Sequence, residues 1–400
     1  MQPLRFATAG SVDDGKSTLI GRLLYDARAV QEDQLAAVER ASQRRGAAQI
    51  DLSLLTDGLE AEREQGITID VAYRYFATPR RKFIIADGPG HVQYTRNMAT
   101  GASNADALVL LLDVSKKLLP QTRKHLQIAR LLGIRQVVAF VNKMDAAGWS
   151  RAAFDAAATD LKAFAAPLGL ETLDIIPGSA LLGDMVVERG PLGEMRLGWY
   201  RGPTLLERLE TLHSGVEAAA TGPFRFPIQL VSRPQGDASR GYMGRIESGH
   251  LLAGTEVLLL PSGRRTRVRQ ILSNGASREL AVAGDSVTLV LADDIDTARG
   301  DLIADPANPP RETRALDVTL VWLGHELMRP GGRYLVQQGS RRILAKVHAP
   351  EPLALNDIGP ARLTLNAPHF VDSYDSVRTT GSLILIDEAT NHTVAAGLVK

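Results

Sequence analysis

Cysteine is absent from this 400-residue chain. Its absence excludes disulfide bonds, thiolate-bound zinc, iron–sulfur clusters and cysteine nucleophiles. An excess of charge of either sign is absent too, because 46 lysines and arginines balance 45 aspartates and glutamates and leave a formal net charge of +1. Such a chain has no overall field that would draw it to nucleic acid or to a membrane surface. We therefore expect neither of these as a partner.

Long apolar runs are also missing. None approaches the ~18 residues of a membrane-spanning helix, and the densest, residues 105–112, has the length of a buried strand. The N-terminus passes directly into a strand-like segment, without the basic segment, apolar stretch and cleavage site of a secretory signal. These absences predict a soluble cytoplasmic protein.

The first half of the chain alternates strand and helix signals. Apolar strand patterns are found at residues 4–9, 72–76, 82–86, 107–113, 136–142 and 173–177. Helical patterns are found at residues 17–25, 94–103, 121–132, 151–164 and 204–212. This alternation predicts an α/β domain with a doubly wound, mostly parallel sheet.

The pattern changes after about residue 215. Short alternating strands separated by Gly, Pro, Asn and Ser turns follow at residues 224–231, 242–247, 256–260, 266–272 and 286–291. This spacing favours a β-barrel. Residues 306–310 resemble a linker, and a second β segment continues to the end. The sequence thus predicts an α/β domain over residues 1–215 and two small antiparallel β-barrels over residues 222–309 and 312–400.

Residues 10–17 read GSVDDGKS between a strand and a helix, which is the phosphate-loop pattern in its proper context. Glycines let the backbone curl so that several N–H groups face one anion, and the start of the helix adds its positive dipole end. We expect Lys16 to reach the β- and γ-phosphates of a nucleotide and the Ser17 hydroxyl to hold Mg²⁺. The loop residues predicted to bind the nucleotide are Gly10, Ser11, Val12, Asp13, Asp14, Gly15, Lys16, Ser17 and Thr18.

Residues 87–90 read DGPG directly after an apolar strand. Asp87 can bind Mg²⁺ through water, and Gly90 can offer its N–H to a γ-phosphate. Thr68 is the candidate switch threonine, whose hydroxyl would ligate Mg²⁺ only while the triphosphate is bound; the alternative is a β-branched start of a strand. His91 is the candidate for contact with the attacking water, so the predicted catalytic set is His91, Lys16 and Thr68.

Residues 142–145 read NKMD after another apolar strand. The Asp145 carboxylate suits the N1–H and N2–H₂ donors of guanine, a donor pair that adenine lacks. Asn142 and the stem of Lys143 would brace the loop and cover the ring. The tripeptide Ser179-Ala180-Leu181 can add backbone donors to guanine O6. Each motif alone could be a solvated turn, but their order predicts a P-loop GTPase domain that uses GTP and Mg²⁺.

Longer stretches resemble a known class of proteins. The segments EREQGITID at 62–70 and DGPGH at 87–91, with the two barrels behind them, resemble the translation-factor class of GTPases, such as elongation factor Tu and elongation factor 1-alpha. Within that class, residues 10–24, 67–76, 83–87 and 93–103 are similar to the family of GTPase subunits of bacterial sulfate adenylyltransferase.

This resemblance implies a heterodimer. In that family a smaller subunit makes adenosine 5′-phosphosulfate and pyrophosphate from ATP and sulfate, and GTP hydrolysis on the larger subunit drives this unfavourable reaction. Some relatives are fused to an adenylylsulfate kinase, but this chain has no second phosphate loop. Two other interpretations stay open: a translation factor that carries aminoacyl-tRNA, and a regulatory GTPase without a coupled enzyme.

The chain departs from the family pattern at a few positions. Gly88 replaces a usual threonine, Val92 a usual glutamate and Met185 a usual asparagine. The C-terminal extension common in relatives is not present in this sequence. Lys116 and Lys117, after the strand at 107–113, are interpreted as surface residues.

Overall fold

The computed structural model describes residues 3–44, 50–56, 71–89, 95–190, 193–215, 219–233 and 240–400. The chain falls into two compact units, Met1–Ser214 and Gly215–Lys400. No helix in these described ranges is long and apolar enough to span a membrane.

The first unit is built on one six-stranded sheet. Its strands are β1 (Leu4–Ala9), β2 (Ala72–Ala77), β3 (Lys82–Asp87), β4 (Ala107–Asp113), β5 (Gln136–Asn142) and β6 (Thr172–Pro177). Their order is β2-β3-β1-β4-β5-β6, and every neighbouring pair is parallel except β2–β3. The predicted mostly parallel sheet is therefore confirmed.

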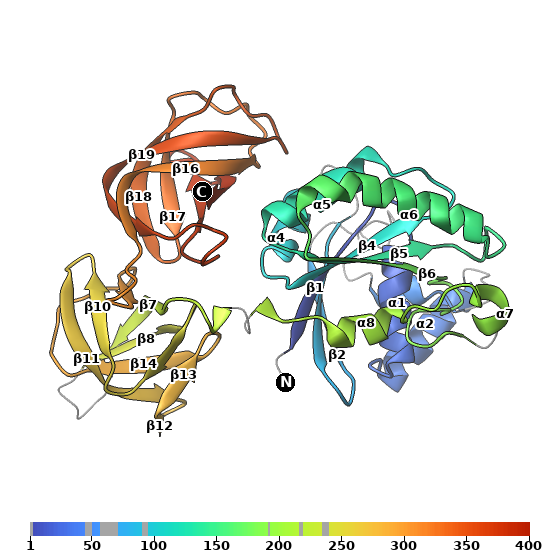
Figure 1. Ribbon diagram of the computed structural model, residues 1–400, viewed down its shortest axis with the longest axis horizontal. Coiled ribbons are helices and arrows are strands. Elements are labelled where there is room, and N and C mark those ends of the chain that lie inside the picture. The colour runs from blue at the N-terminus through green and yellow to red at the C-terminus, as the bar shows by residue number, and fades with distance from the viewer. Residues whose placement is uncertain are drawn as a thin grey trace. The chain divides into compact units, whose positions relative to one another are not determined.

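Helices cover both faces of this sheet (Figure 1). The α-helices are α1 (Lys16–Asp26), α2 (Glu32–Arg44), α4 (Thr95–Ala102), α5 (Pro120–Leu131), α6 (Arg151–Ala165), α7 (Gly193–Leu197) and α8 (Leu205–Thr211). Short 3₁₀ turns are η1 (Leu52–Leu55) and η3 (Ala166–Leu168). The sequence prediction did not include α2, because this helix is polar and buries only Val38 and Ser42.

The central strand β4 shows how the layers pack. Leu108, Leu110 and Leu112 belong to the core beneath α4, α5 and α6, whereas Val109 and Leu111 belong to the core beneath α1 and α8. Successive side chains of a strand point to opposite faces, so a strand covered on both sides is apolar throughout. This explains the unbroken apolar run that the sequence shows here.

The second unit begins with a barrel. Its strands are β7 (Arg225–Ser232), β8 (Gly241–Arg245), β9 (His250–Leu252), β10 (Glu256–Leu260), β11 (Arg264–Ser273), β12 (Ala276–Arg278), β13 (Leu280–Val282), β14 (Ser286–Leu291) and β15 (Leu302–Ala304). The order β10-β15-β7-β8-β14-β11 closes because β10 also pairs with β11. The short strands β9, β12, β13 and β15 were not predicted, since three residues are too few to show an alternating pattern.

The second barrel of this unit contains longer strands. They are β16 (Arg311–Trp322), β17 (Arg333–Gln338), β18 (Arg341–His348), β19 (Ile358–Val371), β20 (Ser382–Ile386) and β21 (Thr393–Val399). They close in the order β16-β19-β18-β17-β20-β21. A buried ion pair joins the two barrels, because the Arg225 guanidinium donates to both carboxylate oxygens of Asp372 at 2.8 Å. The predicted barrels that follow the α/β domain are thus confirmed.

Candidate functional site

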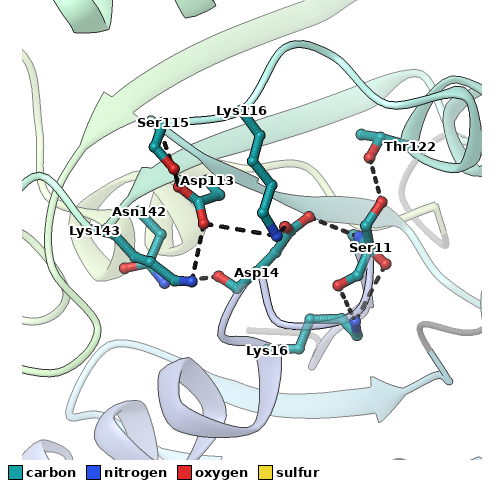
Figure 2. A network of polar contacts seen from close by, with 10 residues as sticks. Ser11, Asp14, Lys16, Asp113, Ser115, Lys116, Thr122, Asn142 and Lys143 are labelled. Carbon is teal, nitrogen blue, oxygen red and sulfur yellow. Dashed lines mark hydrogen bonds and ion pairs between the residues drawn. The ribbon is translucent and has the colours of Figure 1, made fainter. Parts of the chain in front are cut away.

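The predicted nucleotide motifs lie at one edge of the sheet. The loops after β1, β3, β4, β5 and β6 all leave the carboxyl ends of parallel strands, where open α/β sheets bind their ligands. Figure 2 shows that residues from three of these loops, together with Thr122 of α5, form one network of polar contacts.

The phosphate loop is shaped by Gly15 and Lys16. Gly15 caps α1 with φ 92°, a conformation that favours glycine. A Cβ on Gly15 would lie only 2.4 Å from the Asn142 Nδ2 atom. The Lys16 ammonium donates to the carbonyl oxygens of Gly10 at 3.2 Å and Ser11 at 2.9 Å. Burial lowers the pKa of Lys16, although the nearby Asp87 charge opposes that shift.

Asp14 and Thr122 fix the position of Ser11 near the start of the phosphate loop. The Ser11 backbone N–H donates to Asp14 Oδ2 at 2.7 Å, and the hydroxyls of Ser11 and Thr122 lie 3.1 Å apart. Asp14 and Thr122 are both buried. Since the loop is held by these contacts, its backbone is ordered around the place where phosphates would bind.

Asn142 joins three loops. Its Nδ2 donates to the Asp14 carbonyl at 2.8 Å, and its Oδ1 accepts from the Ala180 backbone N–H at 2.8 Å. The phosphate loop, the NKMD segment and the Ser179–Leu181 tripeptide are therefore brought together, as the sequence predicted. Ser179 and Ala180 are fully buried, whereas Leu181 is half exposed.

Asp145 has a carboxylate oxygen, Oδ1, that is buried and has no hydrogen-bond partner among the described residues. A buried acceptor without a donor costs free energy, and a bound base that presents N–H groups would remove that cost. The position after Asn142 and Lys143 is the one expected for guanine recognition. The unpaired acceptor of the site thus fits the N–H donors of a guanine base.

Arg22 of α1 was not among the predicted site residues. Its guanidinium donates to the carbonyls of Leu181 at 2.6 Å and Ala180 at 3.4 Å, and it lies 3.5 Å from Asp26. These contacts fix the tripeptide that follows β6. An arginine in the second turn of a helix has no local signal in the sequence that would identify such a contact.

The interpretation of Lys116 as a surface residue was wrong. Its ammonium lies 3.5 Å from Asp14 Oδ1 and 3.7 Å from Asp113 Oδ2, and Lys143 reaches Asp113 Oδ2 at 2.9 Å. Burial alone would raise the pKa of Asp113, but hydrogen bonds from Ser115 and Lys143 outweigh it and lower the pKa. Lys116 therefore belongs to the site.

Ser17 and Asp87 carry the oxygen donors that Mg²⁺ prefers. Ser17 is in the first turn of α1, and buried Asp87 at the end of β3 accepts a hydrogen bond from the Thr8 hydroxyl at 3.1 Å. No group of three His, Cys, Asp or Glu residues forms a metal site in the part of the chain that the structure describes. Mg²⁺ held by nucleotide phosphates needs only one or two protein oxygens, so these donors fit it.

Thr68, Gly90 and His91 lie outside the described residues, as does Val92. The other two departures from the family pattern can be located. A Cβ on Gly88 would lie 3.3 Å from the Met98 Cα atom, which is a tight contact. Met185 is fully buried at φ 65°, a left-handed conformation that asparagine adopts more readily than methionine.

Comparisons with known proteins agree with this geometry. The model of the elongation factor Tu GTP binding domain matches residues 2–216, and the GTP-eEF1A C-terminal domain-like model matches residues 335–400. Sulfate adenylyltransferase subunit 1 of Aeromonas salmonicida is 46% identical over 99% of this chain and 86% of its own length. Its counterpart in Rhizobium meliloti is 48% identical over 100% of this chain and 82% of its own length.

A longer relative is the bifunctional enzyme NodQ of a Rhizobium species. It is 47% identical over 99% of this chain, which spans 63% of the length of that enzyme.

Proposed function

The chain belongs to the sulfate adenylyltransferase subunit 1 family and carries the elongation factor Tu type of GTP-binding domain, and we propose that it hydrolyses GTP to drive sulfate activation on a partner subunit. The partner would be the smaller sulfate adenylyltransferase subunit, which makes adenosine 5′-phosphosulfate and pyrophosphate from ATP and sulfate. A name that reads "subunit 1" itself implies a second subunit. The observation that supports this proposal most is an identity of 46–48% that extends over nearly all of the chain.

Different residues of the site would bind the phosphates and the base of the nucleotide. Lys16 would leave the carbonyls of Gly10 and Ser11 and place its ammonium against the β- and γ-phosphates. Asp145 would accept the N–H donors of guanine, and Asn142 would keep the base loop and the phosphate loop in register. Phosphoryl transfer asks mainly for positioning and charge neutralisation, which these groups supply.

Mg²⁺ bound by Ser17, by Thr68 and, through water, by Asp87 would neutralise phosphate charge. In the sequence pattern Thr68 is the residue that would distinguish GTP from GDP, and His91 the one that would contact the attacking water. Replacing either residue by alanine should lower GTP hydrolysis while GDP binding is retained. An equal loss of GTP hydrolysis and of GDP binding would argue against these two roles.

The barrels predicted at 222–309 and 312–400 are the candidates for holding the partner subunit. Transport of aminoacyl-tRNA, the other function of this GTPase class considered from the sequence, is not favoured by the relatives. Regulation by conformational coupling requires only that the partner bind the GTP and GDP states with different affinity.

The test combines the purified chain with the smaller subunit from the same source, ATP and sulfate. Adenosine 5′-phosphosulfate and pyrophosphate are measured with and without GTP, and a Lys16→Ala chain serves as the control. Product that rises beyond the GTP-free equilibrium only with the unaltered chain is the expected result. GTP hydrolysis without any such rise would reject the coupling, and absence of hydrolysis in the mixture would reject the GTPase assignment as well.

A further inference from the structure

Four charged side chains connect the two ends of the nucleotide site (Figure 2). From the phosphate loop they run Asp14, Lys116, Asp113 and Lys143, with successive nitrogen–oxygen distances of 3.5, 3.7 and 2.9 Å. We call this series the ion-pair bridge. Asp14 also accepts from the Ser11 N–H of the phosphate loop, and Lys143 belongs to the NKMD segment that leads to Asp145. The bridge therefore contacts the phosphate end and the base end of the site.

Lys116 is the central cation of the bridge. It is the only link between the two carboxylates among the described contacts, because Lys143 reaches Asp113 but not Asp14. Asn142 offers a second path, but it contacts the Asp14 backbone and not the carboxylate. Removing the Lys116 charge would break the connection between the two loops at its centre.

The carboxylates depend on that charge because they are buried. The side chains of Asp14 and Asp113 are 3% and 4% exposed, whereas that of Lys116 is 35% exposed. A buried carboxylate that loses its counter-charge is strongly destabilised, in contrast to a fully exposed ion pair, which contributes little. Burial already raises the pKa of Asp14, and the positive charges of Lys116 and Lys16 oppose that shift.

We propose that Lys116 is a positioning residue that couples guanine recognition to the phosphate loop through the Asp14–Lys116–Asp113–Lys143 bridge. The inference rests on the proposed function, since it concerns the same nucleotide site. A base bound to Asp145 would then stabilise the phosphate loop in its binding conformation. Phosphate bound in the loop would in turn stabilise the binding conformation of the NKMD segment. Loss of the Lys116 charge would therefore lower the affinity of the site for both the base and the phosphates of the nucleotide.

Lys116→Met tests this, because methionine keeps most of the length of the unbranched side chain and loses the charge. GDP release should become about three- to tenfold faster, as expected for a coupled contact at a partly buried site. The ratio of the affinity for GDP to that for inosine diphosphate, which lacks the exocyclic amine, should also decrease. Stopped-flow release of a fluorescent GDP and competition by inosine diphosphate measure the two effects.

Matched variants separate positioning from general stability. Lys116→Arg should restore most of the slow release and the base preference, since it keeps the charge. Lys117→Met changes the neighbouring lysine, which is exposed and has no ion pair within the described ranges, and it should behave as the unaltered chain does. A loss of GDP and inosine diphosphate affinity by the same factor, without rescue by arginine, would overturn the proposal in favour of a structural role.

A double-mutant cycle gives the second test. If Lys116 acts through Asp113, then Lys116→Met and Asp113→Asn should each speed GDP release, and the combined variant should be no faster than the stronger single one. Strictly additive effects on the logarithm of the rate would overturn the proposal. GDP release from Lys116→Met at the rate of the unaltered chain would also overturn the proposal. The proposed function would then still stand if the unaltered chain bound GTP. If the unaltered chain did not bind GDP, the proposed function itself would be rejected.

Discussion

At the scale of single residues, Asp145 makes the choice of base testable. Its buried Oδ1 lacks a donor among the described residues, so guanine N–H groups would satisfy it. Asp145→Asn would present an amide donor in the same place, and we expect GTP affinity to fall by about a hundredfold or more, with xanthosine triphosphate becoming preferred. Competition between the two nucleotides for the purified variant measures the change.

Lys16→Ala is the control for the Asp145 variant. It should lose affinity for both triphosphates, because it removes a phosphate contact and leaves the base contact unchanged. An Asp145→Asn chain that still prefers GTP would show that another group recognises guanine.

Gly15 gives a second expectation at this scale. Alanine there would adopt φ 92° and place its Cβ 2.4 Å from Asn142 Nδ2. Gly15→Ala should therefore move Asn142, weaken nucleotide binding at least tenfold and lower the unfolding free energy by about 1–3 kcal/mol. Calorimetric titration with GDP and urea unfolding measure the two effects.

Gly169→Ala is the matched control, because Gly169 has φ 61° and an added Cβ would meet nothing within 4 Å. It should show only the cost of the left-handed backbone, about 1 kcal/mol. Equal effects of the two substitutions would mean that contact with Asn142 is unimportant.

At the scale of an element, strand β19 carries a buried histidine. His369 is 1% exposed, both its ring nitrogens lack partners among the described residues, and burial, helped by the Arg341 charge, lowers its pKa to about 4. In the unfolded chain the imidazole has its ordinary pKa of 6.5. Between these values the unfolded state binds more protons, so the folded state loses stability as the pH falls from about 6.5 toward 4.

Replacing His369 by glutamine should flatten this pH dependence. The loss of unfolding free energy between pH 7 and pH 5 should shrink by about 2 kcal/mol, since each pH unit below 6.5 costs about 1.4 kcal/mol. Urea unfolding at both pH values is the measurement, and His392→Gln controls for the loss of an exposed histidine. A variant with the same pH dependence as the unaltered chain would show that His369 does not contribute.

At the scale of the whole molecule, the Arg225–Asp372 pair is a buried ionic contact between the two barrels. Arg225 is 2% exposed and Asp372 9%, so removing one partner leaves a buried charge uncompensated. Asp372→Ala should lower the unfolding free energy of the second unit by about 3–5 kcal/mol. Hydrogen exchange of the barrel strands, together with urea unfolding, measures this loss.

An exposed pair in the same unit supplies the comparison. Arg362 and Asp317 lie 3.7 Å apart with side chains 62% and 63% exposed. Arg362→Ala should cost about 0.5 kcal/mol or less. Similar costs for the two substitutions would mean that the buried pair does not hold the barrels together.

Much of the architecture could be predicted because the relevant signals are local. The apolar runs at β4 and β5 and the glycines of the phosphate loop each specify their own conformation. Polar α2 lacked a clear apolar face, and strands of three residues were too short to recognise. The domain boundaries at 215, 222, 309 and 312 stay predictions.

The site was predictable in part for the same reason. Asn142, Ala180 and Asp14 could be placed together, since their motifs follow strands that end at one edge. Lys116 and Arg22 could not, because no recognised nucleotide-binding motif contains either residue and their partners lie 102 and 159 positions away in the sequence. Only the folded chain brings those charges and carbonyls within reach.

The position of β1 at the centre of the sheet has a consequence for the time course of synthesis. Leu4–Ala9 is made before every other strand of this sheet, and its neighbours β3 and β4 begin only at Lys82 and Ala107. At a translation rate of about 5–20 residues per second, this apolar segment waits on the order of five to twenty seconds for both partners. During that interval the nascent chain exposes an apolar, aggregation-prone segment next to its phosphate loop. Binding of this segment by a ribosome-associated chaperone should therefore raise the yield of folded protein.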